Sequence, residues 1–134
     1  MAYHHPIRIE FNHCDPAGIV FYPRYFEMAN SVCENFFRDE VGVSYAEMMA
    51  GGHGVPTVRI ETDFRGPSRL GELIRWTLVV EKLGTTSVTF RLKVEGRLTI
   101  RLTLVWLAAD FRPRPWPDAM RAGLAKHLES QDAA

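Results

Sequence analysis

Four long segments rich in β-branched and other apolar residues fill the second half of the chain, and they restrict its fold more than any other feature. Short glycine-containing turns separate them, and they span residues 55–64, 70–82, 87–94 and 98–109. In the first segment apolar residues recur at every second position, which is the period of a strand with one buried face. We therefore expect four long strands, and the short turns predict that consecutive strands pair as antiparallel hairpins.

One long amphipathic helix precedes these strands. From Pro23 onward, apolar residues recur at three- and four-residue spacing over about four turns, and Gly42 follows the end of the pattern. Proline suits the first turn because its missing N–H would be unpaired there in any case. A shorter alternating segment at residues 7–11 predicts a further strand, with a turn at 12–18. One apolar helix lying on one antiparallel sheet makes an α+β domain of two layers.

Two short helices complete the expected structure. A segment from Ser44 to Met49 carries Glu47 three residues after the serine, which is the spacing of a capping box. Residues 118–128, which follow three closely spaced prolines, predict a C-terminal helix. We expect a single domain over residues 1–134, because a chain of 134 residues is short for two independent cores.

Charge and composition exclude several functional classes. Sixteen basic and sixteen acidic residues leave no net charge, whereas a nucleic-acid binder needs a basic surface to neutralise phosphates. No apolar stretch approaches the roughly 20 residues that span a bilayer, and the first residues lack a secretory signal. Two cysteines, Cys14 and Cys33, are too few for a disulfide framework and lack zinc-ligand spacing. We expect a soluble, cytoplasmic protein without a metal, binding neither nucleic acid nor a membrane.

Charge is unevenly divided along the chain. Residues 1–58 contain three basic and seven acidic residues, and residues 59–134 contain thirteen and nine, so the two parts carry −4 and +4. Two interpretations are open. The basic part holds a compact anionic ligand, or its charges lie on solvated strand faces.

The segment Phe11-Asn-His-Cys-Asp-Pro-Ala-Gly-Ile-Val-Phe-Tyr-Pro-Arg-Tyr25 is the most informative for function. It puts Asp15 in a tight turn just before the N-terminus of the amphipathic helix. Free N–H groups and the helix dipole at such an end hold an anion or polarise a carbonyl oxygen. A carboxylate beside them acts as nucleophile or general base on that carbonyl. Alternatively, Asp15 only stabilises an Asx turn.

The pattern Ile-Glu-Phe-x-x-Cys-Asp-Pro-Ala-Gly-Ile-Val-x-x-Pro-x-Tyr, at residues 9–25, resembles the 4-hydroxybenzoyl-CoA thioesterase family of hotdog-fold enzymes. The aspartate, the glycine, an aromatic pair and the final tyrosine fall at the family spacing. The segment Gly54-Val-Pro-Thr-Val58 and the strand series also fit, so the resemblance covers roughly residues 5 to 125 of the chain.

The resemblance implies a hotdog fold, in which a five-stranded antiparallel sheet wraps a long central helix. It implies active sites at the interface of a homodimer, often within a homotetramer. The catalytic aspartate of the family falls on Asp15, and the backbone N–H that polarises the thioester carbonyl falls near Tyr22. No metal and no redox cofactor take part, and coenzyme A is part of the substrate.

Further substrate-binding candidates come from the same motif and from its surroundings. Asn30 falls where the hydroxybenzoyl enzyme has an acidic residue facing the ring hydroxyl, so the hydrogen bond is kept but the charge is lost. The basic run that meets coenzyme A phosphates in that enzyme falls near residues 83–86, where cations are absent here. The full set of candidates is His13, Gly18, Phe21, Tyr25, Asn30, Arg65 and Arg69, with Arg112 and Arg114 as further phosphate contacts.

We therefore expect an acyl-CoA thioesterase that hydrolyses an aryl- or acyl-CoA thioester, of the 4-hydroxybenzoyl-CoA kind. An alternative is a non-catalytic hotdog protein that binds acyl-CoA or an aromatic ligand. A hotdog dehydratase is less favoured. That chemistry typically pairs a histidine with an acid, and the histidines of this chain are poorly placed to form such a pair. Glu47 is the catalytic candidate of an alternative hotdog type, although its position in a capping box is the favoured explanation. Long sheet edges predict at least a dimer.

Overall fold

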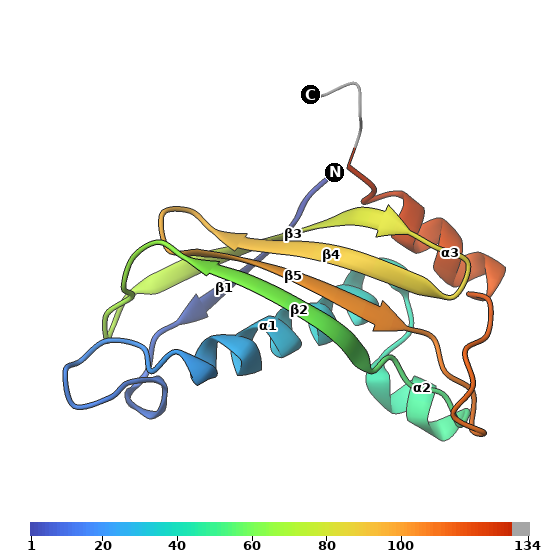
Figure 1. The fold of residues 1–134 in the computed structure, drawn as a ribbon, viewed down its shortest axis with the longest axis horizontal. Helices are drawn as coiled ribbons and strands as arrows, with labels where there is room; N and C mark the ends of the chain where they lie inside the picture. Colours follow the sequence, from blue (N-terminus) through green and yellow to red (C-terminus); the bar gives the residue numbers. More distant parts are fainter. Residues whose placement is uncertain (130–134) are drawn as a thin grey trace.

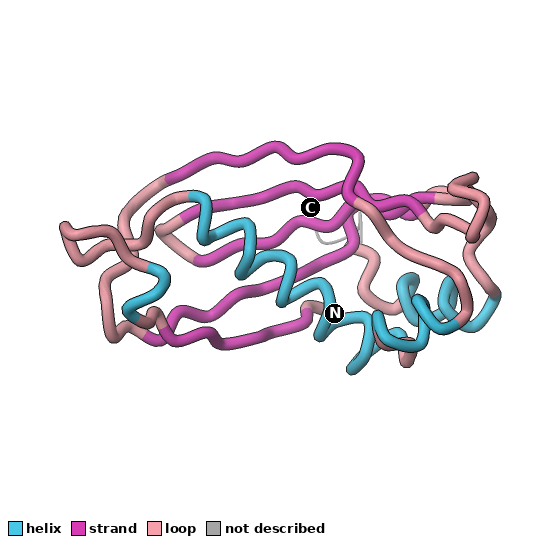
Figure 2. Tube along the Cα trace, turned by 90° about the horizontal axis from the view of Figure 1, so that it is seen from below, coloured by secondary structure: helices cyan, strands magenta, loops and turns pink. Residues whose placement is uncertain are grey.

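The structure, a computed structural model, describes residues 1–129. One five-stranded antiparallel sheet carries a long helix on its concave face (Figures 1 and 2), which confirms the expected α+β hotdog fold. The elements are β1 (Tyr3–Arg8), α1 (Pro23–Phe36), α2 (Tyr45–Ala50), β2 (Thr57–Phe64), β3 (Leu73–Leu83), β4 (Ser87–Val94), β5 (Leu98–Val105) and α3 (Asp118–Ala125). The expected domain runs to residue 134, and residues 130–134 lie outside the described part.

The order of the strands differs from a chain of consecutive hairpins. It is β1-β3-β4-β5-β2, so β2 pairs with β5 at one edge and β3 pairs with β1. The hairpin expected between residues 55–64 and 70–82 is therefore wrong. Residues 65–72 do not form a tight turn there, because their backbone bonds to Gly18, Val20 and Arg97 instead. This leaves β2 as an outer strand with one free edge.

The first strand also lies earlier than its alternation indicated. It spans Tyr3–Arg8, and Phe11–His13 form one 3-10 turn rather than the end of a strand at 7–11. The turn is closed by local bonds: the N–H of Glu10 donates to Nδ1 of His13 (2.8 Å). A side chain that satisfies the backbone in this way competes with extended pairing. The chain therefore leaves the sheet before it reaches Asp15.

Helix α1 begins at Pro23 as predicted and buries its apolar side against the sheet. Phe36 is fully buried and packs edge-to-face on Phe90 of β4, with ring centroids 5.3 Å apart. The helix continues into one π-helical turn, Phe37–Val41, which ends at Gly42 with φ of 87°. Figure 2 shows the helix crossing the sheet diagonally, so its N-terminus lies at one end of the sheet.

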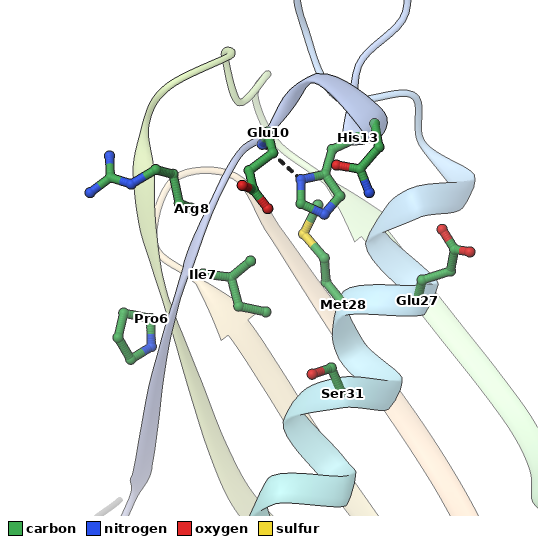
Figure 3. A pocket seen from close by; sticks show the side chains of 9 residues that line it. Pro6, Ile7, Arg8, Glu10, His13, Glu27, Met28 and Ser31 are labelled. Carbon is green, nitrogen blue, oxygen red and sulfur yellow. Dashed lines mark hydrogen bonds between the residues drawn. The ribbon is translucent and has the colours of Figure 1, made fainter.

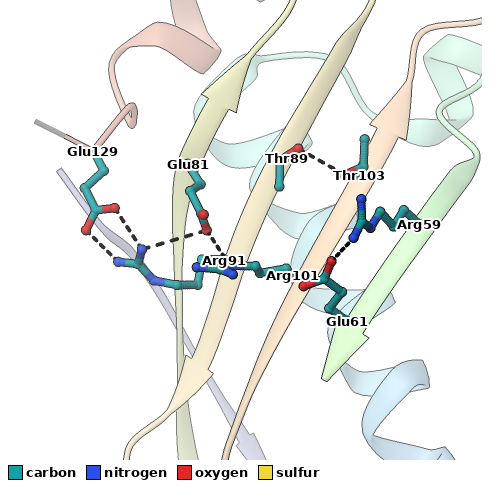
Figure 4. A network of polar contacts seen from close by, with 8 residues as sticks. All are labelled: Arg59, Glu61, Glu81, Thr89, Arg91, Arg101, Thr103 and Glu129. Atoms are coloured by element: carbon teal, nitrogen blue, oxygen red, sulfur yellow. Dashed lines mark hydrogen bonds and ion pairs between the residues drawn. The ribbon is translucent and has the colours of Figure 1, made fainter. Parts of the chain in front are cut away.

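The outer face of the sheet carries charged side chains that pair with one another (Figure 4). Arg91 makes two bonds to Glu129, at 2.8 and 2.6 Å, and Arg101 donates to Glu81 at 3.0 Å. Arg59 pairs with Glu61 on β2. Several basic residues of the second half therefore lie on a solvated strand face. For these residues the second interpretation of the charge pattern, solvated strand faces, is the one that applies. No helix in the described part is long and apolar enough to cross a membrane.

Candidate active site

The loop before α1 folds back on itself as a small hairpin. The N–H of Phe21 donates to the carbonyl of His13 (2.9 Å), and the N–H of Asp15 donates to that of Ile19 (3.1 Å). Gly18 turns the chain with φ of 79°, a left-handed conformation that a side chain would strain. The hairpin thus places Asp15 on the loop that leads directly into the N-terminus of α1.

The carboxylate of Asp15 has one engaged oxygen and one free one. Its Oδ1 accepts a hydrogen bond from the N–H of Ala17 (2.9 Å), which is the Asx turn that we considered as an alternative. Its Oδ2 has no hydrogen-bond partner among residues 1–129. The Asx turn orients the side chain and leaves one oxygen available, so the two interpretations of Asp15 are compatible.

One backbone donor is left free where α1 begins. The N–H of Phe21 is taken by His13, Pro23 has none, and the N–H of Arg24 donates to the carbonyl of Phe21 (2.9 Å). The N–H of Tyr22 has no acceptor in the described structure. The resemblance implies a backbone donor near Tyr22, and of the N–H groups at Phe21, Tyr22 and Arg24 only that of Tyr22 is left unpaired in the described structure. Such a donor, with the positive end of the helix dipole behind it, suits a carbonyl oxygen.

The connection between β2 and β3 lies against this loop. The N–H of Val20 donates to the carbonyl of Ser68 (2.9 Å), and the N–H of Leu70 donates to that of Gly18 (3.0 Å). Arg69 bridges Ile19, so it lies beside the loop, and Arg65 stands where β2 ends. Both side chains are exposed, and neither has an acidic partner within residues 1–129.

Two other candidate arginines lie elsewhere. Arg112 and Arg114 follow β5, where Leu107 bridges Gly54 and Pro113. This is the end of the sheet near α2, away from the loop before α1 (Figure 1). Arg114 is paired with Asp110 at 2.8 Å. Within one chain, these two do not approach Asp15.

The Arg97 brace, a cluster of hydrogen bonds donated by Arg97, lies behind the connection between β2 and β3 and was not predictable from the sequence. Arg97 donates to both carboxylate oxygens of Glu72 (3.1 and 2.7 Å), to Oγ of Ser68 (3.0 Å) and to the carbonyl of Pro67 (3.1 Å). Ser68 is fully buried. Arg97 is 25 to 30 residues from the other three along the chain, so no local pattern indicates that they meet. The Arg97 brace fixes the connection between β2 and β3. That connection is hydrogen-bonded to Gly18 and Val20 and so holds the loop that carries Asp15.

We expect the Arg97 brace to make the stability of the folded protein depend on pH in the acid range. Hydrogen bonds from Arg97 hold the pKa of Glu72 below its usual range. A lowered pKa in the folded protein stabilises it at pH values above the unfolded pKa of about 4.3, and this stabilisation is lost as pH falls through the folded pKa. Glu72→Gln should therefore lower the melting temperature at pH 7 and have little effect at pH 2.5. An equal decrease in melting temperature at both pH values would contradict this prediction.

His13 faces a different space from Asp15. It lines a groove of about 620 Å³ between β1 and α1, together with Arg8, Glu27 and Ser31 (Figure 3). Neither Asp15 nor Tyr22 lines this groove. His13 and Asp15 do not lie on one strand face, because β1 ends at Arg8.

Aromatic residues surround the N-terminus of α1. The rings of Phe21 and Tyr22 are exposed and pack edge-to-face (5.7 Å), and Tyr22 also contacts Phe64 at the end of β2 (6.2 Å). Tyr25 is 4% exposed and packs against Phe64 and Trp76, so its ring lies in the core rather than in an open pocket. The exposed rings form an apolar surface next to the free N–H.

The remaining candidates lie on the helices. Asn30 is exposed on α1, eight residues after Tyr22 and thus about 12 Å along the helix. Glu47 and Ser44 form the predicted capping box, with both of its hydrogen bonds at 3.1 Å. The carboxylate of Glu47 is thereby engaged at the start of α2. Among residues 1–129, no cluster of three or more His, Cys, Asp or Glu side chains is arranged to hold a metal ion.

Residues 9–124 match the family model described as the thioesterase-like superfamily. No curated protein sequence matches the chain significantly. Among solved structures, a gentisyl-coenzyme A thioesterase is 26% identical, with a TM-score of 0.79, covering 92% of this chain and 99% of its own.

Two further solved structures show likeness of fold alone. A hypothetical protein from Staphylococcus aureus, solved in complex with CoA, is 14% identical, with a TM-score of 0.88. The match covers 97% of this chain and 87% of that one. A 1,4-dihydroxy-2-naphthoyl-CoA thioesterase from Synechocystis is 15% identical, with a TM-score of 0.80, and the match covers 93% and 96% of the two chains.

Proposed function

The chain belongs to the thioesterase-like superfamily, and from this premise we propose that it hydrolyses an acyl-CoA thioester to a carboxylate and free coenzyme A. One observation carries the proposal. The unpaired N–H of Tyr22 and the free Oδ2 of Asp15 belong to the same short loop at the N-terminus of α1. A donor for a carbonyl oxygen and a carboxylate that attacks its carbon are the two groups that thioester hydrolysis requires.

In the proposed mechanism the thioester carbonyl oxygen accepts a hydrogen bond from Tyr22. Negative charge develops on that oxygen as the carbon is attacked, and the N–H and the helix dipole stabilise it. Asp15 either attacks the carbon or directs a water molecule to it. The C–S bond then breaks and the CoA thiolate leaves; where Asp15 itself attacked, water then hydrolyses the acyl–Asp15 anhydride and frees the carboxylate. Overall, one water is consumed, and a carboxylate, a proton and free CoA are released.

We propose that no resident cofactor takes part, since coenzyme A enters as part of the substrate. The proposed steps use only a carboxylate, a backbone N–H and water. We also propose a cytoplasmic location. Cys14 and Cys33 are free thiols, which suits a reducing compartment.

For the acyl group we propose an aromatic one, of the hydroxybenzoyl kind. The motif at residues 9–25 supports this, as does likeness to a gentisyl-coenzyme A thioesterase. The exposed rings of Phe21, Tyr22 and Phe64 supply an apolar surface beside the proposed carbonyl site. Asn30 on α1 would offer a neutral hydrogen-bonding group rather than a charged one.

We propose that two chains pair through β2, as a homodimer or within a homotetramer. Its free edge carries Val58, Ile60 and Phe64, which are 60%, 47% and 50% exposed although they are apolar. The other edge strand, β1, contains Pro6, which cannot donate to a ladder. Exposed apolar side chains on an unpaired strand favour pairing with another strand.

The experiment that tests the function is a hydrolysis assay. Purified protein is given benzoyl-, hydroxybenzoyl-, short-chain and long-chain acyl-CoA, and free CoA is followed with a thiol reagent. Turnover that depends on Asp15 supports the thioesterase. Tight binding of the thioesters without any turnover would instead support the alternative, a non-catalytic acyl-CoA binding protein.

Arg65 and Arg69 are the proposed contacts to the phosphates of coenzyme A. A phosphate contact is equally present in the ground and transition states, so its loss raises KM more than it lowers kcat. We expect the double variant Arg65→Ala/Arg69→Ala to raise KM at least about tenfold, since a charged hydrogen bond is worth roughly 1.5–3 kcal/mol, with kcat within about twofold. Arg75→Ala, on the exposed part of β3, is the control. An unchanged KM would place the phosphates elsewhere.

A further inference from the structure

The connection between β2 and β3 is fixed at its start by the backbone of Arg97. The carbonyl oxygen of Arg97 accepts hydrogen bonds from the N–H groups of Arg65 (2.7 Å) and Gly66 (3.1 Å). A Cβ built on Gly66 would lie 2.9 Å from the carbonyl oxygen of Gly96, so the connection packs directly on the turn before β5. These contacts are made by the main chain, and they do not depend on the side chain of Arg97.

The middle and the end of the connection depend on the Arg97 brace. The planar fork of the guanidinium reaches Oγ of Ser68 (3.0 Å), the carbonyl of Pro67 (3.1 Å) and both carboxylate oxygens of Glu72. One of these carboxylate oxygens, Oε1, also accepts a hydrogen bond from the N–H of Arg69 (2.6 Å). One side chain from the turn before β5 thus holds three points of a segment that lies 25 to 30 residues away along the chain.

Two backbone hydrogen bonds carry this hold from the connection to the hairpin before α1. The carbonyl of Ser68 accepts a hydrogen bond from the N–H of Val20 (2.9 Å), and the N–H of Leu70 donates to the carbonyl of Gly18 (3.0 Å). The N–H of Gly18 in turn donates to the carbonyl of Asp15 (3.0 Å). These bonds join the connection to the turn of Asp15 through the backbone.

Few buried side chains fix the position of this hairpin. Of residues 15–20, only Val20 is buried, and the two residues at the tip are exposed. The hairpin leads directly into the N-terminus of α1, so its position sets the carboxylate of Asp15 relative to the N–H of Tyr22. A displacement of about 1 Å between reacting groups can cost on the order of a hundredfold in rate. The hydrogen bonds to the connection are therefore the contacts on which this alignment depends.

We propose that Arg97 is a positioning residue of the reaction, whose guanidinium holds the carboxylate of Asp15 in line with the N–H of Tyr22 by fixing the connection between β2 and β3. This inference rests on the proposed thioesterase function. The Arg97 brace also holds Arg69 through Glu72, and Arg69 is a proposed phosphate contact. The kinetic constants separate the two effects, because displacement of the hairpin lowers kcat, whereas displacement of a phosphate contact raises KM.

Arg97→Ala removes the guanidinium and keeps the backbone bonds to Arg65 and Gly66, so the protein should fold. We expect kcat for the best thioester substrate to fall at least about tenfold, since a small displacement of reacting groups is costly. Arg91→Ala is the matched control. Arg91 makes a similar two-bond pair with Glu129 (2.8 and 2.6 Å), and its side chain is 30% exposed against 28% for Arg97. The kcat of this control should stay within about twofold of the wild type.

Both variants are assayed well below their melting temperatures, which circular dichroism measures. An unchanged kcat in a folded Arg97→Ala protein, or an equal fall of kcat in both variants, would overturn the proposal. If the alanine variant does not fold, Arg97→Lys takes its place, because lysine keeps the charge and lacks the planar fork. We expect its kcat to fall at least about threefold, and a folded Arg97→Lys protein with wild-type kcat would overturn the proposal as well.

Free guanidinium ion gives a measurement that a merely stabilising role of Arg97 would not affect. The ion can donate hydrogen bonds to Glu72 and Ser68 in the space that the side chain leaves. At constant ionic strength, millimolar guanidinium chloride should raise the kcat of Arg97→Ala at least about threefold. It should leave the kcat of Arg91→Ala and of Asp15→Asn unchanged. An equal rise in all three proteins would contradict the positioning role.

Amide hydrogen exchange of Val20 and Leu70, followed by NMR, tests the hold on the hairpin without any substrate. Both N–H groups should exchange at least about tenfold faster in Arg97→Ala than in the wild type, and at the wild-type rate in Arg91→Ala. Unchanged exchange in Arg97→Ala would overturn the proposal whatever the activity. A wild-type protein that hydrolyses no thioester would instead refute the proposed function, and faster exchange would still show that Arg97 holds the hairpin. The two failures are therefore distinguishable.

Discussion

Asp15→Asn should fold like the wild type and hydrolyse thioesters at least about a hundredfold more slowly, the lower end expected when a positioned base or nucleophile is lost. The amide oxygen of asparagine still accepts the hydrogen bond that Ala17 donates to Asp15. The turn and the free N–H of Tyr22 therefore remain, and only the charge is removed. Steady-state kinetics and thermal unfolding of both proteins measure the two effects.

A matched control is available at Asp110. Its Oδ1 accepts a hydrogen bond from the N–H of Arg112 (3.0 Å), which is the same local arrangement two residues on. Asp110→Asn should leave turnover within about twofold, because the second carboxylate oxygen of Asp110 is paired with Arg114 (2.8 Å) and is no part of the proposed carbonyl site. If Asp15→Asn keeps more than half of the wild-type turnover, Asp15 is a turn residue. If it melts well below the wild type, the loss of activity reflects folding.

Ile60→Asp should convert the protein into a folded monomer of 15.3 kDa with at least about a hundredfold less activity. In one chain Ile60 is 47% exposed, so a charge there costs the isolated fold little. In a β2-paired dimer the two new carboxylates would be buried without a partner, which costs several kcal/mol. Activity should fall with the dimer, because the resemblance implies an active site at the interface of two chains. Sedimentation at micromolar concentration and circular dichroism follow association and folding.

Leu73→Asp is the control for this variant. Leu73 is an exposed apolar residue at the start of β3 (58% exposed), away from the free edge of β2. The Leu73→Asp protein should remain dimeric and active. A dimeric and active Ile60→Asp protein would show that the chains do not pair through β2. A monomeric but fully active one would show that each chain holds a complete site.

Local features were predictable from the sequence because the residues that make them are neighbours along the chain. The capping box of Ser44 and Glu47 is confirmed, as is the start of α1 at Pro23. In both cases side chain and backbone lie within one helical turn. The alternation of the strands likewise identified β4 and β5 from their own residues.

The limits of the strands were less predictable, for a related reason. Alternation continues past Val105 and before Leu73, yet β5 ends at the first and β3 begins at the second. A strand ends where its partner ends, and the partner is distant in sequence. At the N-terminus, strand pairing ends at Arg8, and a hydrogen bond from Glu10 to the ring of His13 closes a 3-10 turn at Phe11–His13.

The sequence by itself determined the helix, the number of strands, their alternating faces and the candidate aspartate. Periodicity and motif spacing depend only on residues that are neighbours along the chain. Only the tertiary structure decided that β2 lies at a free edge, that the N–H of Tyr22 at the start of α1 has no acceptor in the described structure, and that Arg97 holds the connection before β3 through Ser68 and Glu72. These features depend on which distant segments meet. Backbone groups must find partners wherever the packed chain supplies them, and no local pattern encodes that choice.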